Sequence, residues 1–293
     1  MTFESRFPQR SPEWRLRRRT LAFSRRPALM GIVNVTPDSF SDGGSFLAPQ
    51  AAIDHALQLV QDGAEILDIG GESTRPYSAP VSTAEELRRI APVVAAVCEQ
   101  TDVPVSIDTS KAAVAEEALQ AGAEIVNDVT GLEGDPNMLD VVLKYHPGVC
   151  AMHMRGTPQT MQDDPAYENV VEEIGDYLRR RRELLQEAGL DPLRVCLDPG
   201  IGFGKTHQHN LILLSRCGEY HALQRPLLVG HSRKGFIAHV LGDKEADRTA
   251  GVLGVSVQLA LQGIQVLRVH DVRQVRDALL LFEAAGGLGA TVG

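Results

Sequence analysis

The stretch Met30-Gly-Ile-Val-Asn-Val-Thr-Pro-Asp-Ser-Phe-Ser-Asp-Gly-Gly44 joins a short apolar run to a long polar segment. The apolar residues 28–35 predict a buried β-strand. Thr36-Pro37-Asp38 is typical of a turn, and Gly43-Gly44 lets the backbone approach a ligand or move as a lid. Asn34 lies near the strand end, where its side-chain oxygen could meet a metal or a phosphate. A βα connection needs only a few residues, so a loop this long and polar indicates function.

The same pattern continues along the chain, with apolar runs that end in polar residues and precede amphipathic stretches. Eight runs are predicted as strands: Ala28–Val33, Glu65–Ile69, Val103–Ile107, Glu124–Val126, Val149–Met152, Val195–Leu197, Leu227–Val229 and Gln265–Val269. A helix is expected after each, for example at Gln50–Gln61, Thr83–Cys98, Lys111–Ala121, Asn169–Ala188 and Asp271–Ala285. Eight βα units of this length predict a (β/α)8 TIM barrel. A doubly wound sheet is the main alternative, but its glycine fingerprint is missing after the first strand.

Composition limits the possible partners. The chain has 43% hydrophobic and 23% charged residues, as ordinary globular proteins do. Its net charge is -9, and its basic residues are dispersed apart from one N-terminal cluster, which argues against a nucleic-acid partner. No apolar run is long enough to span a membrane, so no membrane association is expected.

One domain is expected at residues 27–293, after an extension at residues 1–26. The extension carries Arg15 and Arg17–Arg19, and we expect it to be partly ordered through Trp14. It contains no apolar signal core. The cysteines at 98, 150, 196 and 217 have no metal-binding or CxxC spacing. They predict small buried thiols in a reducing compartment, and hence a cytoplasmic protein.

The residues that follow the predicted strands are the main functional signal, because barrel enzymes carry their chemistry at the C-terminal ends of the strands. These residues are Asn34, Asp68, Asp108-Thr-Ser-Lys111, Asn127-Asp128, Met152-His-Met-Arg155, Asp198-Pro-Gly-Ile-Gly-Phe-Gly-Lys205, Ser232-Arg-Lys234 and Arg268-Val-His-Asp271.

Asp108 and Asp198 each follow an apolar run directly, and a carboxylate there is costly unless a partner satisfies it. With Asn127 between them along the chain, they could bind a flat heterocycle with an amidine-like edge. The alternative is a structural salt bridge to Lys111 or Lys205.

Asp68 is open to two interpretations of equal weight, a functional carboxylate or an anchor for a neighbouring loop. Thr74 and Arg75 follow on a loop that Pro76 and Pro80 stiffen. Arginine suits bidentate binding of an oxyanion, although a solvated surface arginine is the alternative.

Lys234, Arg268 and His270 come from the last two predicted strands, where barrels frequently bind phosphate. Asp271 and Gln274 have the spacing of a capping box, which places a helix N-terminus behind them. That terminus favours an anion. The sequence therefore predicts an anion site here, with ligand-free surface charges as the alternative.

Phe203, in the glycine-rich stretch after strand six, is predicted to pack on a ligand ring, with core packing as a comparable possibility. Met152 is predicted to line the same site or to belong to the core. His153, His207 and His209 are expected to be solvated loop histidines and not metal ligands, because Asn34 stands where a metal-dependent hydrolase barrel has a His-x-His motif.

Together these motifs resemble the signatures of dihydropteroate synthases, which join a pterin to 4-aminobenzoate, over residues 28–285. The resemblance rests on the opening loop and on Asp68-Ile-Gly-Gly-Glu-Ser-Thr-Arg-Pro76, Asp108-Thr-Ser-Lys111, Asn127-Asp128, Met152-His-Met154, Asp198-Pro-Gly200, Ser232-Arg-Lys234 and Arg268-Val-His270. It implies that the pterin is held by Asp108, Asn127, Asp198 and Lys234. It implies that Thr74 binds the same substrate near its diphosphate end, that Arg75, Arg268 and His270 hold the diphosphate itself, and that Asn34 meets a Mg2+ ion. Ser232 and Lys234 would shape the aminobenzoate site.

The resemblance also implies a mechanism, in which departing diphosphate leaves a pterin cation that ionised Asp108 and Asp198 favour. Asp108, Asp198 and Lys234 are therefore the expected catalytic residues. Family analogy adds a homodimer. Two alternatives share the barrel: a pterin-binding methyltransferase, which needs no diphosphate site, and a paralogue that has lost catalysis.

Overall fold

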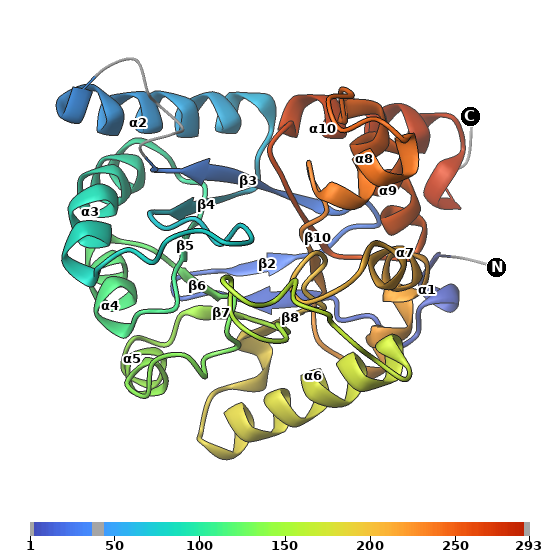
Figure 1. The fold of residues 1–293 in the computed structure, drawn as a ribbon, viewed down its shortest axis with the longest axis horizontal. Helices are drawn as coiled ribbons and strands as arrows, with labels where there is room; N and C mark the ends of the chain where they lie inside the picture. Colours follow the sequence, from blue (N-terminus) through green and yellow to red (C-terminus); the bar gives the residue numbers. More distant parts are fainter. Residues whose placement is uncertain (1–2, 37–43, 290–293) are drawn as a thin grey trace.

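The computed structural model describes residues 3–36 and 44–289 and contains a ring of parallel strands surrounded by helices (Figure 1). The eight strands are adjacent in the order β8-β7-β6-β5-β4-β3-β10-β9. Their bounds are β3 (Ala28–Asn34), β4 (Ile66–Gly70), β5 (Val105–Asp108), β6 (Ile125–Asp128), β7 (Gly148–Met152), β8 (Val195–Asp198), β9 (Leu228–Val229) and β10 (Val266–Val269). A parallel bridge between Leu197 and Leu227 joins β8 to the chain entering β9 and nearly closes the ring. The predicted TIM barrel is confirmed.

The helices alternate with the strands and cover the outside of the barrel (Figure 1). They are α2 (Gly44–Asp62), α3 (Thr83–Gln100), α4 (Ala112–Ala121), α5 (Met138–Tyr145), α6 (Val170–Glu187), α7 (His207–Arg216), α8 (Gly235–Leu241), α9 (Thr249–Leu261) and α10 (Val272–Ala284). The predicted start of the first helix at Gln50 is wrong, because α2 begins at Gly44. Pro49 lies inside this helix, and proline is typical of a helix start, so the sequence indicated a later beginning.

The burial pattern explains why these segments adopt these structures. Every residue of β3 except the last is buried, as expected for a parallel strand covered on both faces. Helix α6 buries one apolar stripe that includes Val170, Ile174 and Leu178. The side chain of Asn169 begins this helix by accepting a hydrogen bond from the backbone N–H of Glu172 at 3.4 Å.

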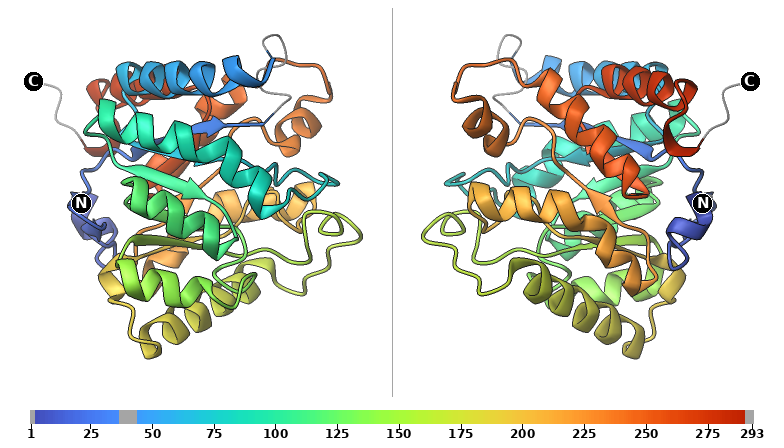
Figure 2. Two further views of the ribbon diagram at one scale, coloured as in Figure 1. Left: turned by 90° about the vertical axis from the view of Figure 1, so that its left-hand side faces the viewer. Right: turned by 90° about the vertical axis from the view of Figure 1, so that its right-hand side faces the viewer.

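The N-terminal segment covers the N-terminal end of the barrel. After α1 (Phe3–Arg6), β1 (Glu13–Arg15) pairs with β2 (Thr20–Ala22) in an antiparallel hairpin. Trp14, in β1, is fully buried among side chains from the first residues of several barrel strands, and its Nε1–H donates to Arg194 O at 2.8 Å. The extension is thus more ordered than the partial order expected from Trp14. The opposite end of the molecule carries the long loops after β4 and β7 (Figure 2).

Within residues 3–36 and 44–289, none of the helices combines the length and apolar character that crossing a membrane requires. The cysteines are free thiols, and Cys150, Cys196 and Cys217 are buried as predicted.

Candidate active site at the C-terminal end of the barrel

The barrel brings the residues at the strand ends to one rim. Asp108 ends β5, Asn127 lies in β6, and Asp198 ends β8. The register pairs Asp108 with Asn127 on adjacent strands and Met152 with Asp198. Asp108 and Asn127 therefore lie side by side on adjacent strands, and Asp198 lies two strands from Asn127, at the same C-terminal end of the barrel.

Arg268, from β10, lies between two carboxylates. Its Nε–H donates to Asp68 Oδ2 at 2.5 Å, and its Nη2–H donates to Asp108 Oδ2 at 2.6 Å. Asn127 Nδ2–H donates to the same oxygen of Asp68 at 3.1 Å. The anchoring role considered for Asp68 is thus present, and its partners are themselves predicted site residues. The alternative of a salt bridge between Asp108 and Lys111 is wrong, because Asp108 pairs with Arg268.

The charges of this cluster are strongly coupled. Burial raises the pKa of Asp108 to about 7, while the Arg268 guanidinium opposes the shift and the Asp68 carboxylate adds to it. The same carboxylates raise the pKa of Arg268 against the effect of burial, so its charge is retained. Asp108 therefore exchanges its proton close to neutral pH, whereas Arg268 stays a fixed cation.

A second carboxylate, Asp198, and the ammonium of Lys234 act on each other's charge at the same rim. Burial raises the pKa of Asp198, and a hydrogen bond from the Gly200 N–H to its Oδ1 at 2.7 Å and the Lys234 ammonium oppose the shift. Burial lowers the pKa of Lys234 to about 8, with Asp198 acting in the opposite direction. Lys234 Nζ lies 4.6 Å from the centroid of the Phe203 ring and donates to Ile201 O. Lys234 is thus beside the aromatic ring and Asp198.

Position 200, two residues after Asp198, requires glycine because the backbone of His153 packs directly against it. Gly200 has a positive φ of 69°, and a Cβ atom there would lie 1.9 Å from His153 O and 3.3 Å from Met152 Cγ. Met152 is itself 3% exposed, so core packing accounts for most of its side chain. The glycine lets the loop after β8 lie against the end of β7.

Ser232 and His270 are in direct contact, with Ser232 Oγ 3.0 Å from His270 Nδ1. Burial, together with the charges of Arg268, Arg233 and Arg75, lowers the pKa of His270 to about 3. The histidine is therefore neutral at pH 7 and lies within the field of three guanidinium groups. This concentration of positive charge suits an anion.

The predicted capping box at the start of α10 is wrong. Asp271 is the N-cap residue, but its side chain makes no capping hydrogen bond. Its carboxylate instead accepts from Arg233 Nε–H at 3.1 Å and Nη2–H at 2.5 Å. A bidentate pair with a guanidinium competes with the cap, and sequence spacing cannot reveal that partner.

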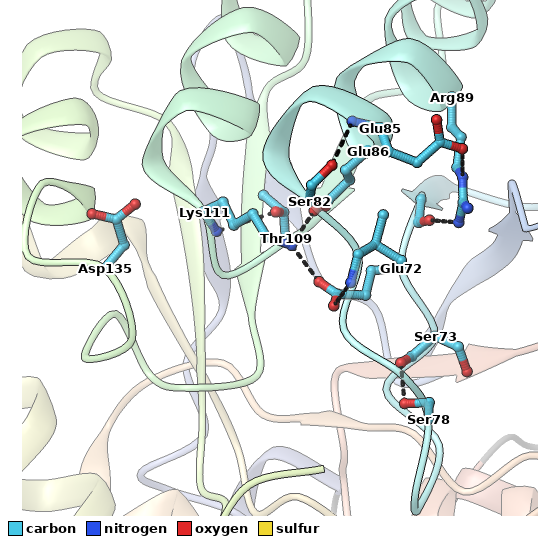
Figure 3. Close-up of polar contacts among 12 residues, drawn as sticks. Glu72, Ser73, Ser78, Ser82, Glu85, Glu86, Arg89, Thr109, Lys111 and Asp135 are labelled. Carbon is cyan, nitrogen blue, oxygen red and sulfur yellow. Dashed lines mark hydrogen bonds and ion pairs between the residues drawn. The ribbon is translucent and has the colours of Figure 1, made fainter. Parts of the chain in front are cut away.

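The loop after β4 carries Thr74, which is half-buried, and Arg75, which is exposed. Ser78 Oγ–H donates to Ser73 O at 2.5 Å and closes the loop locally (Figure 3). Tyr77 N–H at the loop tip donates to Pro158 O at 3.0 Å, which joins this loop to the one after β7. The Arg75 charge acts on His270, so the loop and β10 contribute to one positively charged region.

The expectation of a solvated His153 is wrong. The side chain is buried, and its Nδ1 lies 3.0 Å from Nζ of Lys205, which is also buried. Burial lowers the pKa of His153 to about 2 and that of Lys205 well below the usual range. The cause is the loop after β7, which folds over the loop after β8 through a hydrogen bond from Tyr167 OH to Gly204 O at 2.8 Å.

The other two histidines lie at the start of α7. His207 is exposed and stacks on His239 with ring centroids 4.4 Å apart, and His209 Nδ1 accepts from the N–H of Thr206. Across the described ranges, which omit residues 37–43, no three or more His, Cys, Asp or Glu side chains are grouped to hold a metal.

Asn34 ends β3 next to Gly70 of β4, at the same rim. A single amide oxygen fits Mg2+ only where the other ligands are water and substrate oxygens, which is how Mg2+ is usually bound. The remainder of the predicted opening loop, including Pro37, Asp38 and Gly43, lies outside the described residues.

Comparison with known proteins identifies the family. The family model for pterin binding enzymes matches residues 30–270. Dihydropteroate synthase from Escherichia coli is 44% identical over 258 residues, which cover 88% of this chain and 91% of the relative. The Bacillus subtilis enzyme is 39% identical over 265 residues, with 90% of each chain covered.

Solved structures agree with this result. Xanthomonas albilineans dihydropteroate synthase with 4-aminobenzoic acid superposes with a TM-score of 0.87 at 42% identity, covering 94% of this chain and 98% of that one. The Yersinia pestis enzyme with a sulfonamide drug also has a TM-score of 0.87, at 43% identity and 93% and 98% coverage. The strand-end residues thus lie on a barrel shared with these enzymes over nearly its whole length, and the chain belongs to the dihydropteroate synthase family.

Proposed function

We propose that this enzyme condenses (7,8-dihydropterin-6-yl)methyl diphosphate with 4-aminobenzoate to give 7,8-dihydropteroate and diphosphate. The observation that carries the proposal is the joint arrangement of Asp108, Asn127 and Asp198 beside a region rich in guanidinium groups. Relatives with 39–44% identity are dihydropteroate synthases, and structures of the Xanthomonas albilineans enzyme contain 4-aminobenzoic acid or 7,8-dihydropteroate. A flat ring with an anionic tail matches such a site.

The ring of the pterin is assigned to the aspartate side of the site. Asp108 and Asp198 would accept the N–H groups of the amidine-like edge, and Asn127 offers both a donor and an acceptor. Phe203 and Met152 would flank the ring as apolar walls. This assignment is supported by the burial of both carboxylates, which raises their pKa values and leaves them in need of hydrogen-bond donors.

The diphosphate is assigned to Thr74, Arg75, Arg268 and His270. The positive charges of both arginines lower the pKa of His270, which supports placing an anion in their shared field. A neutral imidazole and a hydroxyl would complete the set by hydrogen bonding. By stabilising the negative charge on the departing oxygens in the transition state, such a site makes its largest electrostatic contribution to catalysis.

Asn34 is assigned to Mg2+ because its amide oxygen lies at the same rim and suits a hard cation that also binds phosphate oxygens. When bound, Mg2+ would neutralise charge on the leaving diphosphate. Among the described residues Asn34 would supply one ligand, and water and substrate oxygens would supply others.

The charge distribution favours bond cleavage before attack by the amine. Loss of diphosphate leaves a cation that spreads into the pterin ring, and ionised Asp108 and Asp198 stabilise this cation more than the neutral substrate. The neutral aromatic amine of 4-aminobenzoate then attacks, so no strong base is needed. Ser232 and Lys234, with the loop after β4, would form the aminobenzoate site and exclude water that could capture the cation.

The experiment that tests the function is direct. The protein is incubated with the pterin diphosphate and 4-aminobenzoate, and pyrophosphate release and dihydropteroate formation are measured together. Equal amounts of the two products are expected. Methyl transfer from a methylated folate without pyrophosphate release would instead identify a methyltransferase, and no turnover would identify a non-catalytic paralogue.

We also propose a cytoplasmic homodimer. Free buried thiols support a reducing compartment. Exposed Val240 and Leu241 at the end of α8, which are 61% and 51% exposed, offer an apolar contact for a second copy. Sedimentation measurements on the protein and on a Val240→Glu variant test the dimer, which the variant should weaken.

A further inference from the structure

The loop between β4 and α3 is anchored at both ends by charged side chains (Figure 3). Arg89, in α3, donates through Nη1–H to Gly71 O at 2.9 Å where the loop begins. Glu72 Oε1 accepts the N–H of Val81 at 2.8 Å and so links the two ends of the loop. Thr74 and Arg75 lie within the segment that these contacts enclose.

The second carboxylate oxygen of Glu72 binds the ammonium of Lys111 (Figure 3). Lys111 Nζ also lies 2.5 Å from Glu86 Oε2 in α3. We name these three side chains, Glu72, Lys111 and Glu86, the lysine junction. It connects the loop, helix α3 and the start of α4, because Lys111 is the N-cap residue of α4.

The lysine junction depends on a single cation. The Glu86 side chain is 0% exposed, and its Oε1 is without a hydrogen-bond partner within the described part of the chain. Without this ammonium, the buried carboxylate of Glu86 would carry an uncompensated charge, which is costly, and the partly exposed Glu72 would lose its ion-pair partner. Loss of Lys111 would therefore release Glu72 from α3 and α4. Since Glu72 belongs to the loop and Glu86 to α3, the loop itself would lose this attachment.

Lys111 also lies three residues after Asp108, which ends β5 at the rim. The junction thus fixes the loop relative to the strand end that carries a ring-binding carboxylate. The loop tip also contacts the loop after β7, through Tyr77 N–H to Pro158 O at 3.0 Å and Gln159 Nε2–H to Ser78 O at 3.1 Å. The lysine junction fixes the other side of Arg75, through Glu72 at the start of the loop.

From this geometry we propose that Lys111 is a positioning residue, which places Thr74 and Arg75 over the diphosphate through its contacts with Glu72 and Glu86. The inference rests on the proposed function of those two loop residues. It assigns to Lys111 no contact with substrate. The ring-binding residues Asn127 and Asp198 come from other strands and should not depend on the junction.

The test separates the two halves of the substrate. Lys111→Met should raise KM for the pterin diphosphate by about tenfold or more, the effect of losing one hydrogen bond to a charged group. Calorimetric affinity for 6-hydroxymethylpterin, which has the ring without diphosphate, should change by less than about twofold by the same reasoning. Lys111→Arg should recover most of the KM because it restores a cation.

Glu72→Gln provides a milder second variant, since Glu72 is partly exposed and the amide oxygen can still accept from Val81. It should reproduce the raised KM even if Lys111→Met folds poorly. Lys144→Met is the matched control, because Lys144 forms an exposed pair with Glu116 between α4 and α5. Its kinetics should equal those of the unmodified protein.

Two results would overturn the proposal. Equal weakening of both ligands in the Glu72 and Lys111 variants would indicate a general structural role. Unchanged KM for the pterin diphosphate in both variants would show that the junction does not position the loop. If the unmodified protein releases no pyrophosphate from the pterin diphosphate and 4-aminobenzoate, the proposed function fails first and the inference fails with it.

Discussion

Replacing Arg268 with methionine should destabilise the free protein strongly. The guanidinium binds Asp68 at 2.5 Å and Asp108 at 2.6 Å, and these side chains are 0% and 11% exposed. Methionine keeps an apolar chain of similar length but carries no charge, so two buried carboxylates lose their cation. Removing one partner of a buried ion pair costs about 3–5 kcal/mol of the free energy of unfolding.

The loss should depend on pH. Burial already raises the pKa of Asp108 to about 7 although Arg268 opposes the shift, so removal of Arg268 should raise it further. A carboxyl with a higher pKa in the folded state binds its proton more tightly there. Stability therefore rises as pH falls, by about 1.4 kcal/mol per pH unit between the unfolded and folded pKa values. As the pH is lowered from 9, the free energy of unfolding of the variant should begin to rise while the pH is still above 7. In the unmodified protein, protonation of Asp108 adds little stability in that range.

Urea unfolding followed by circular dichroism at pH 6, 7.5 and 9 measures both effects. Adding Asp108→Asn to the Arg268→Met variant should restore part of the stability at pH 9, because only one uncompensated carboxylate remains. Lys144→Met is a suitable surface control. A loss below about 1 kcal/mol that is the same at every pH, as for an exposed ion pair, would refute the pairing of Arg268 with Asp108 in the free protein.

Three further predictions concern catalysis and the N-terminal segment. Asp108→Asn and Asp198→Asn should each lower kcat by at least about tenfold, a loss of about 1.4 kcal/mol of transition-state stabilisation; near-normal kcat in both variants would contradict cation stabilisation. The pH profile of kcat/KM should rise as Asp108 ionises near pH 7 and fall as Lys234 loses its proton near pH 8, and a flat profile between pH 6 and 9 would contradict these roles. Trp14→Ala should lower the free energy of unfolding by about 3–5 kcal/mol without changing kcat of the folded enzyme, and an unchanged urea midpoint would show that Trp14 does not hold the barrel base.

The fold and the aspartate side of the site were predictable from sequence because both depend on local patterns. Asp108, Asn127 and Asp198 each follow or end a short apolar run, and parallel strands in a barrel bring such positions together. Asp68 gives the same signal, since it lies in the apolar run of β4. Its role was left open because nothing nearby in sequence identifies its partners, Asn127 and Arg268.

The remaining features depend on contacts between distant segments. Arg268 is 160 positions from Asp108 in sequence, so no local pattern reveals their pairing. His153 is buried where the loop after β7 folds over the loop after β8, and the buried Glu86 of α3 pairs with Lys111, which is 25 positions away in sequence. Side chains that satisfy one another across loops are thus the part of the site that single-sequence patterns miss.

In the proposed diphosphate site Arg268 binds an anion, whereas in the free protein its guanidinium binds Asp68 and Asp108. Movement of this guanidinium towards an anion would leave Asp108 less compensated, and therefore better suited to a ring that carries N–H donors and positive charge. Pyrophosphate should then strengthen the binding of 6-hydroxymethylpterin, and linkage requires the pterin to strengthen pyrophosphate binding by the same factor. We expect a factor of about five or more, the lower range for coupled sites, and its disappearance in Arg268→Met. Calorimetric titrations of each ligand with and without the other measure this coupling. If the affinity for each ligand is the same with and without the other ligand, Arg268 keeps its aspartate partners throughout. The two halves of the substrate are then recognised independently.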